Sequence, residues 1–116
     1  MDEVLDRNAL LAIVDGDLNL LKELTEIFAP EYVRLFAQLE KAIVEKDASG
    51  LQTSAHAIKS LAGDFCAQRA YEAAETLEQM GRRADFGNAK EVSARLDSET
   101  QAMKAALEQF IKEGSN

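Results

Sequence analysis

Apolar residues recur every three or four positions along most of this chain, and this spacing is the strongest constraint on its fold. Such a period places the apolar side chains on one face of an α-helix. The sequence has no stretch of strict apolar–polar alternation, the pattern typical of a half-buried strand. Only 6 glycines and 1 proline occur among 116 residues, so few positions oppose long helices. The sequence therefore predicts an all-α protein.

Five segments with helical spacing follow one another, separated by short turn signals. We expect a short helix near residues 6–14 and longer helices over 18–46, 48–65, 68–83 and 89–113. Asp6, Asp17 and Asp47 precede the first three, where an aspartate can accept hydrogen bonds from free backbone N–H groups. Pro30 lies inside the second segment and lacks a backbone donor, so we expect a kink or a brief break there. Four long amphipathic helices joined by short turns predict an antiparallel four-helix bundle, with the short N-terminal helix capping one end.

Length and charge narrow the range of functions. A chain of 116 residues is expected to form one domain, residues 1–116. Its formal net charge of −8 disfavours nucleic acid and anionic membrane surfaces as partners, because both attract clustered lysine and arginine. No stretch approaches the ~18 consecutive apolar residues that a membrane span requires. Acidic residues directly after Met1 are unlike a secretory signal peptide, and we expect a cytoplasmic protein.

The reactive side chains are few. Cys66 is the only cysteine, which excludes an internal disulfide and favours a reducing compartment. One cysteine and one histidine cannot provide the ligands of a tetrahedral zinc site, so we expect no bound metal. The sequence contains no phosphate-binding P-loop and no set of nucleophile, base and orienting residue. We therefore expect a protein that is not an enzyme in its own right.

The only histidine, His56, lies in the segment predicted to form the third helix. On a helical wheel the core face contains Leu51, Ala55, Ile58, Ala62 and Phe65, and His56 lies well away from it. The histidine shares its stripe with Gln52, Lys59, Ser60 and Gly63. Lys59 is one helical turn away, with Cβ atoms about 5–6 Å apart. A single exposed histidine is most often a surface residue without chemistry, but the small neighbours here leave room for a partner to approach.

The chain resembles the histidine-containing phosphotransfer (HPt) domains of bacterial multistep two-component phosphorelays. The family motif, a histidine followed by lysine three residues later and then by small residues, stands here as HAIKSLAGDFCA at residues 56–67. The resemblance extends to both sides of this motif. It includes Gly16-Asp17 and Asp47 upstream, and Ala74, Leu77 and Glu78 on the following helix. The similarity thus covers nearly the whole chain.

This resemblance implies a phosphorelay carrier. His56 would accept a phosphoryl group from a receiver-domain aspartate and pass it to another receiver domain, while Lys59 would supply positive charge to the phosphoryl oxygens. Gln52, Ser60 and Gly63 would support the site. The chain would need no cofactor of its own, because magnesium would come from the receiver domain. The implied partners are response-regulator receiver domains and a hybrid sensor histidine kinase, and the implied state is a monomer.

Two departures from the family pattern and one alternative function remain. Ser60 stands where the family most often has glycine, and its hydroxyl can donate to a phosphoryl oxygen. Cys66 replaces a second frequent glycine, and its angular position predicts a small buried side chain in the core. The alternative function is a helical interaction module of the same fold without phosphotransfer, in which His56 is incidental.

Overall fold

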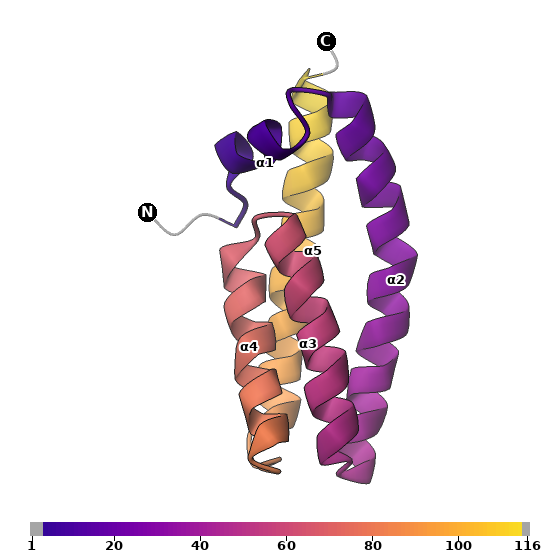
Figure 1. Ribbon diagram of the computed structural model, residues 1–116, viewed down its shortest axis with the longest axis vertical. Coiled ribbons are helices and arrows are strands. Elements are labelled where there is room, and N and C mark those ends of the chain that lie inside the picture. Colours follow the sequence, from indigo (N-terminus) through magenta and orange to yellow (C-terminus); the bar gives the residue numbers. More distant parts are fainter. Residues whose placement is uncertain (1–3, 115–116) are drawn as a thin grey trace.

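The computed structural model describes residues 4–114 and contains five helices and no strand within that range. The helices are α1 (Arg7–Ile13), α2 (Leu18–Glu45), α3 (Ala48–Asp64), α4 (Gln68–Arg82) and α5 (Ala89–Gly114). In Figure 1, α2 to α5 run alongside one another with alternating direction, and α1 lies near the end of the bundle where α2 begins and α5 ends. The predicted all-α bundle with an extra N-terminal helix is confirmed, and each helix limit lies within one residue of the predicted one.

Aspartate caps begin the first three helices, as the sequence predicted. The side chains of Asp6, Asp17 and Asp47 accept hydrogen bonds from the backbone N–H groups three residues later, at 3.0, 3.1 and 3.0 Å. Each bond satisfies a donor that has no partner inside its helix. The caps therefore set the starts of α1, α2 and α3, and α3 is the helix that contains His56.

Helix α2 continues through Pro30 without the break that was one of the two expected outcomes. Aromatic packing on both sides of the proline accompanies this continuity. The Phe28 ring lies 5.8 Å from Tyr32 and 5.0 Å from Phe65, measured between ring centroids. Tyr32 also donates a hydrogen bond of 2.8 Å to Asp97 of α5. These contacts hold α2 against Phe65 and against α5 on either side of Pro30, the residue without a backbone N–H.

The interior of α4 is lined with small residues, which allows it to lie close to α3. Ala70, Ala73, Ala74, Leu77 and Gly81 are buried along one face of α4. Helices with small residues at their contact approach closely. This closeness allows a side chain of α4 to reach the flank of α3 where His56 lies.

Two further sequence expectations concern Cys66 and the membrane. Cys66 lies after the end of α3 with a φ of 54°, is half-buried, and packs against the core. The helical wheel thus stops applying just before Cys66, and the predicted burial in the core is only partial, because the side chain lies against the core and not inside it. No helix among residues 4–114 combines the length and apolarity needed to cross a membrane.

Candidate functional site

His56 projects into solvent from the flank of α3. Its neighbours Leu51, Ala55, Ile58 and Ala62 are buried in the core, whereas 60% of the His56 side-chain surface is exposed. The expectation that the ring lies off the core face and reaches water is confirmed. A partner protein can therefore contact the ring without unfolding the bundle.

A buried carboxylate from α4 holds the inner side of the ring. Oε2 of Glu78 lies 2.7 Å from Nδ1 of His56, and only 2% of the Glu78 side-chain surface is exposed. Glu78 follows Ala74 by one turn and precedes Gly81 by one turn, and both of these are buried. The same stripe that brings α4 close to α3 thus carries Glu78 to the back of the histidine.

Two cations share this carboxylate with the ring. Nζ of Lys59 lies 2.6 Å from Oε1 of Glu78, and the lysine side chain is only 17% exposed. Nη2 of Arg82, one turn further along α4, lies 3.3 Å from Oε2, and half of its side chain is exposed. The ammonium of Lys59 also lies over the ring of Tyr71, 5.8 Å from its centroid. His56, Lys59, Glu78 and Arg82 are referred to below as the Glu78 cluster.

The cluster keeps Glu78 ionised despite its burial. Burial alone would raise the pKa of this carboxyl, but the hydrogen bonds from Lys59 and His56 outweigh burial and lower the pKa below its ordinary value. The same contact with Glu78 is the main reason that the pKa of Lys59 is raised. Near neutral pH the cluster therefore contains a carboxylate and an ammonium in direct contact.

An ionised carboxylate at Nδ1 selects one form of the neutral imidazole ring. A carboxylate can only accept a hydrogen bond, so Nδ1 must carry the proton and donate it to Glu78. The lone pair of the neutral ring then lies on Nε2, the nitrogen not bonded to Glu78. The arrangement is that of a nucleophile whose tautomer and orientation are set by a buried acid.

The supporting residues proposed from the sequence lie near His56 but make different contacts. Gln52 is half-buried, and among residues 4–114 it is Glu78, not Gln52, that is hydrogen-bonded to the ring. The Ser60 hydroxyl donates to the backbone carbonyl of His56 at 3.2 Å, so its hydrogen-bond donor is used within the helix. Gly63 is exposed two turns after His56 on the same stripe.

Sequence reasoning noted Glu78 only as part of the family pattern and did not assign Arg82 to the site. The sequence did contain one indication that Glu78 belongs to the site. Glu78 interrupts an otherwise apolar stripe of α4, and a carboxylate at such a position is rarely buried without a partner. The identity of the partner could not be read from the sequence, because 22 residues separate Glu78 from His56.

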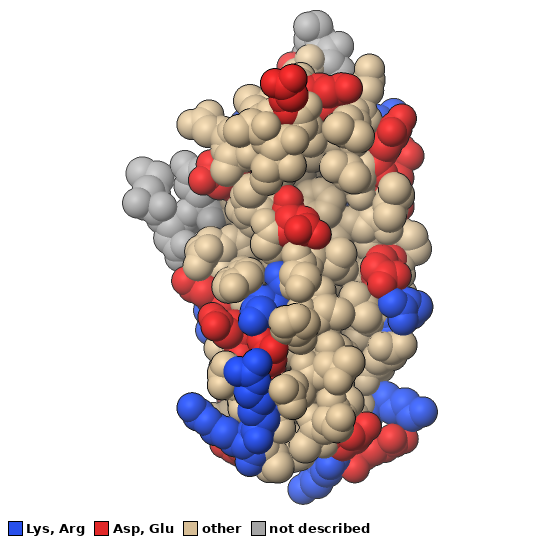
Figure 2. Space-filling model, in the orientation of Figure 1, with Lys and Arg blue, Asp and Glu red and all other residues tan. Residues whose placement is uncertain are grey.

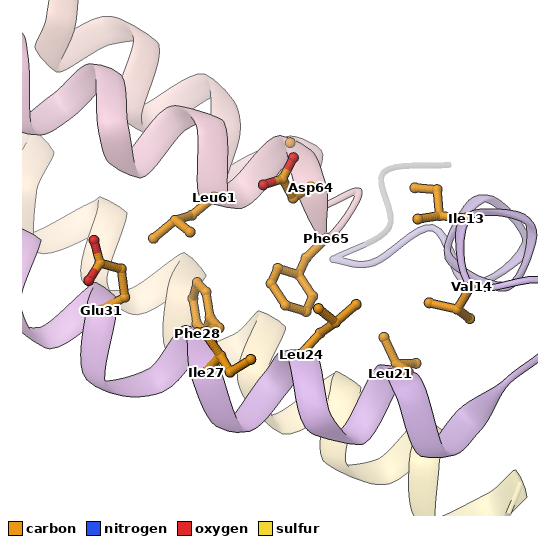
Figure 3. Close-up of a pocket in the computed structure, with 11 residues that line it drawn as sticks. Ile13, Val14, Leu21, Leu24, Ile27, Phe28, Glu31, Leu61, Asp64 and Phe65 are labelled. Atoms are coloured by element: carbon orange, nitrogen blue, oxygen red, sulfur yellow. The ribbon is translucent and has the colours of Figure 1, made fainter.

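An apolar groove of about 430 Å³ lies beside the site, between α1, α2 and the end of α3. Figure 3 shows Leu24 and Phe28 of α2 pointing toward Leu61 of α3 and toward Phe65, the residue that follows α3. Ile27, on the rim, is 67% exposed. The groove is lined by Ile13, Val14, Leu21, Leu24, Ile27, Phe28, Glu31, Leu61, Gly63, Asp64 and Phe65. Leu61 is the lining residue nearest to His56 along α3, five residues away, so the groove begins about 7–8 Å along the helix axis from His56.

Charge is unevenly distributed over the face of the molecule drawn in Figure 2. Acidic side chains and broad uncharged areas dominate toward the end of the bundle where α1 lies, and lysine and arginine gather toward the opposite end. In the described part of the chain, residues 4–114, no group of three or more His, Cys, Asp and Glu side chains is arranged to hold a metal ion.

Comparison with known proteins gives one family and one related structure. The family model described as the Hpt domain matches residues 23–113. No curated protein matches the sequence. The crystal structure of the histidine-containing phosphotransfer protein HptB from Pseudomonas aeruginosa PAO1 is similar, with a TM-score of 0.88 and 18% sequence identity. The alignment covers 97% of this chain and 98% of that protein, so the two share their fold along almost their whole length.

Proposed function

Because this chain belongs to the Hpt family, phosphotransfer carriers of two-component signalling, we propose that His56 accepts a phosphoryl group from the aspartate of one receiver domain and passes it to another. The observation that carries this proposal is the pairing of the exposed His56 ring with the buried Glu78 at 2.7 Å. This pairing leaves Nε2 with a lone pair directed to solvent, as an attack on phosphorus requires.

The transfer follows from the two nitrogens of the ring. The Nε2 lone pair forms a bond to phosphorus while the bond between phosphorus and the aspartyl oxygen breaks, and its electron pair stays on the aspartate. Nδ1 keeps its proton throughout, so the imidazole ring becomes positively charged beside Glu78. Phosphoryl transfer depends mostly on positioning and charge neutralisation, which a few fixed groups can provide.

Lys59 and Arg82 supply positive charge close to the ring, where both contact Glu78, and this charge favours the approach of a phosphoryl group. Lys59 is held by Glu78 and has little freedom, so it acts through its fixed charge. Arg82 is half-exposed and its contact with Glu78 is longer, so its guanidinium can turn toward a phosphoryl oxygen. Ser60 and Gly63 leave space for the partner, Gln52 is a further candidate donor to the phosphoryl group, and the receiver domain supplies magnesium.

The apolar groove is where we expect the receiver domain to dock. Gly63, which lines the groove, lies on the same stripe of α3 as His56, and a partner covering both the groove and the ring would bring its aspartate to the ring. Glu31 and Asp64 lie on the groove, which favours a partner surface with basic residues next to an apolar stripe. We expect the carrier to act as a monomer in the cytoplasm and its complexes to be transient, since each partner must be released.

The deciding experiment is transfer from a receiver domain that has been phosphorylated with labelled phosphate. The wild-type chain is expected to gain an acid-labile label, His56→Gln to gain none, and Lys59→Ala to gain it more slowly. Gln109→Ala serves as a control, because Gln109 is exposed and its side chain donates a hydrogen bond to Glu113 on the same helix, α5. A wild-type chain that binds phosphorylated receivers but never becomes labelled would instead be an interaction module without phosphotransfer.

A further inference from the structure

The buried position of Glu78 bears on the second half of the relay, in which phosphorylated His56 gives its phosphoryl group away. We propose that Glu78 keeps the proton on Nδ1 after phosphorylation, so that the phosphohistidine remains in its donating form into alkaline solution. This inference rests on the proposed function and adds regulation of the same site. Glu78 is a positioning residue here, because it acts on the ring and does not touch the phosphoryl group.

The proton on Nδ1 matters because it determines whether the leaving group in phosphoryl transfer is a neutral imidazole or an anion. In the donor step the bond between Nε2 and phosphorus breaks, its electron pair returns to Nε2, and a new bond forms from phosphorus to the aspartyl oxygen of the acceptor. If Nδ1 carries a proton, the group that leaves is neutral imidazole. If Nδ1 has lost it, the group that leaves is the imidazolate anion, a far stronger base and a poor leaving group.

The geometry makes loss of that proton costly. Oε2 of Glu78 lies 2.7 Å from Nδ1, so a ring without the proton would place two acceptors in contact. Glu78 cannot relieve this contact by turning into water, because its side chain is 2% exposed. Its other oxygen forms an ion pair with Nζ of Lys59 at 2.6 Å, which helps to hold the carboxylate in place.

Several other charged or titratable groups act on the same cluster, and they differ in sign. Lys59 of α3 and Arg82 of α4 are positive and favour loss of the ring proton. Glu75 and Tyr71 of α4 act on Lys59, which the charge of Glu75 helps to keep protonated. Among residues 4–114, Glu78 is the group hydrogen-bonded to Nδ1, and its negative charge opposes the two cations. The balance predicts that removing Glu78 and removing Lys59 shift in opposite directions the pH at which phosphorylated His56 loses its Nδ1 proton.

The test uses the whole chain with ¹⁵N-labelled histidine, phosphorylated at His56 chemically with phosphoramidate so that no receiver is needed. The ¹⁵N shift of Nδ1, followed from pH 6 to pH 10, reports whether that nitrogen carries a proton. In Glu78→Gln the midpoint for proton loss is expected to fall by about 1–3 pH units, the usual effect of removing a contacting opposite charge. In Lys59→Met it is expected to rise, which a loss of structure alone would not produce.

A matched control is available at the other side of α4. Glu99 is a partly buried carboxylate paired with Arg69 at 2.7 Å, and Glu99→Gln removes a similar ion pair without touching His56. In Glu99→Gln the midpoint for proton loss from Nδ1 should equal that of the wild type. Transfer to one receiver domain then provides the functional measurement. The rate from Glu78→Gln, relative to the wild type, should fall about tenfold for each pH unit above the variant's midpoint.

The outcomes separate this inference from the proposed function. Equal midpoints in the wild type and Glu78→Gln, or a lower midpoint in Lys59→Met, would overturn the role of Glu78 even if both proteins relay phosphate. Should phosphoramidate label His56 but no receiver exchange phosphate with it, the proposed relay would fail while the ¹⁵N titration still decides the role of Glu78.

Discussion

Gly81 of α4 lies directly against the backbone of Gln52 in α3. A Cβ atom at position 81 would lie 2.6 Å from the Gln52 backbone nitrogen and 3.0 Å from the carbonyl oxygen of Ala48. Gln52 is one turn before His56, and Gly81 is one turn after Glu78. This close approach of the two helices thus lies beside the contact that orients the histidine.

Gly81→Ala should therefore destabilise the bundle and disturb the site together. The new methyl group meets backbone atoms that cannot turn aside, and overpacking of this kind costs about 1–3 kcal/mol. This cost exceeds the gain of about 1 kcal/mol that alanine gives over glycine inside a helix. Thermal unfolding should show a lower Tm, and the rate of labelling of His56 should fall as well.

Gly63→Ala is the matched control for that substitution. A Cβ atom at position 63 would lie 3.6 Å from the Tyr71 ring, an ordinary van der Waals contact. The variant should be as stable as the wild type or more stable by up to about 1 kcal/mol. Equal losses of stability in the two variants would contradict the close approach at Gly81.

Arg82→Ala should slow phosphoryl transfer without unfolding the protein. The guanidinium lies 3.3 Å from Glu78 at a half-exposed position, from which it can reach an incoming phosphoryl group. We expect a loss on the order of tenfold in rate, smaller than the 10²–10³-fold typical of a buried, preorganised donor. Arg83→Ala, which changes the adjacent exposed arginine, should leave the rate unchanged. Single-turnover transfer from one receiver domain measures both, and equal rates in the two variants would remove Arg82 from the mechanism.

Ile27→Lys should weaken docking of the receiver domain. Ile27 is 67% exposed on the rim of the apolar groove, and a lysine there places a charge where the partner's apolar surface must lie. The concentration of receiver needed for half-maximal transfer should rise about tenfold or more, with little change in the rate at saturation. Val44→Lys is the control, since Val44 is 82% exposed on the same helix but about 25 Å away along its axis. A similar rise in both variants would argue against the groove as the docking site.

The stability contributed by Glu78 should disappear in acid. Because the folded protein holds the pKa of Glu78 below its ordinary value of 4.5, the carboxylate stabilises the fold above that value. The contribution is lost as the pH falls through the lower folded value. Wild type should exceed Glu78→Gln in unfolding free energy by about 1–3 kcal/mol at pH 7, and the difference should shrink steadily below pH 4.5. Urea unfolding at a series of pH values measures this, and a constant difference would show that Glu78 is not ionised in the fold.

The sequence by itself determined the helices, their starts and the exposure of His56. These features depend on contacts between residues a few positions apart: the aspartate caps, the helical spacing of apolar residues, and the position of His56 away from the Leu51–Ile58 stripe. Local geometry is nearly the same in every helix, so spacing alone is enough to predict it. The continuity of α2 at Pro30 was harder to foresee, because it accompanies aromatic contacts with residues distant in sequence, such as Phe65.

Only the tertiary structure decided which groups act on the histidine. The sequence placed Lys59 beside His56 by helical spacing, but the lysine forms an ion pair with Glu78, which also holds the ring and reaches it from another helix. That contact requires α4 to approach α3 at a particular register, set by alanines and by Gly81 against Gln52. Register between helices depends on how side chains of distant segments fit together, and spacing within one segment carries no information about it.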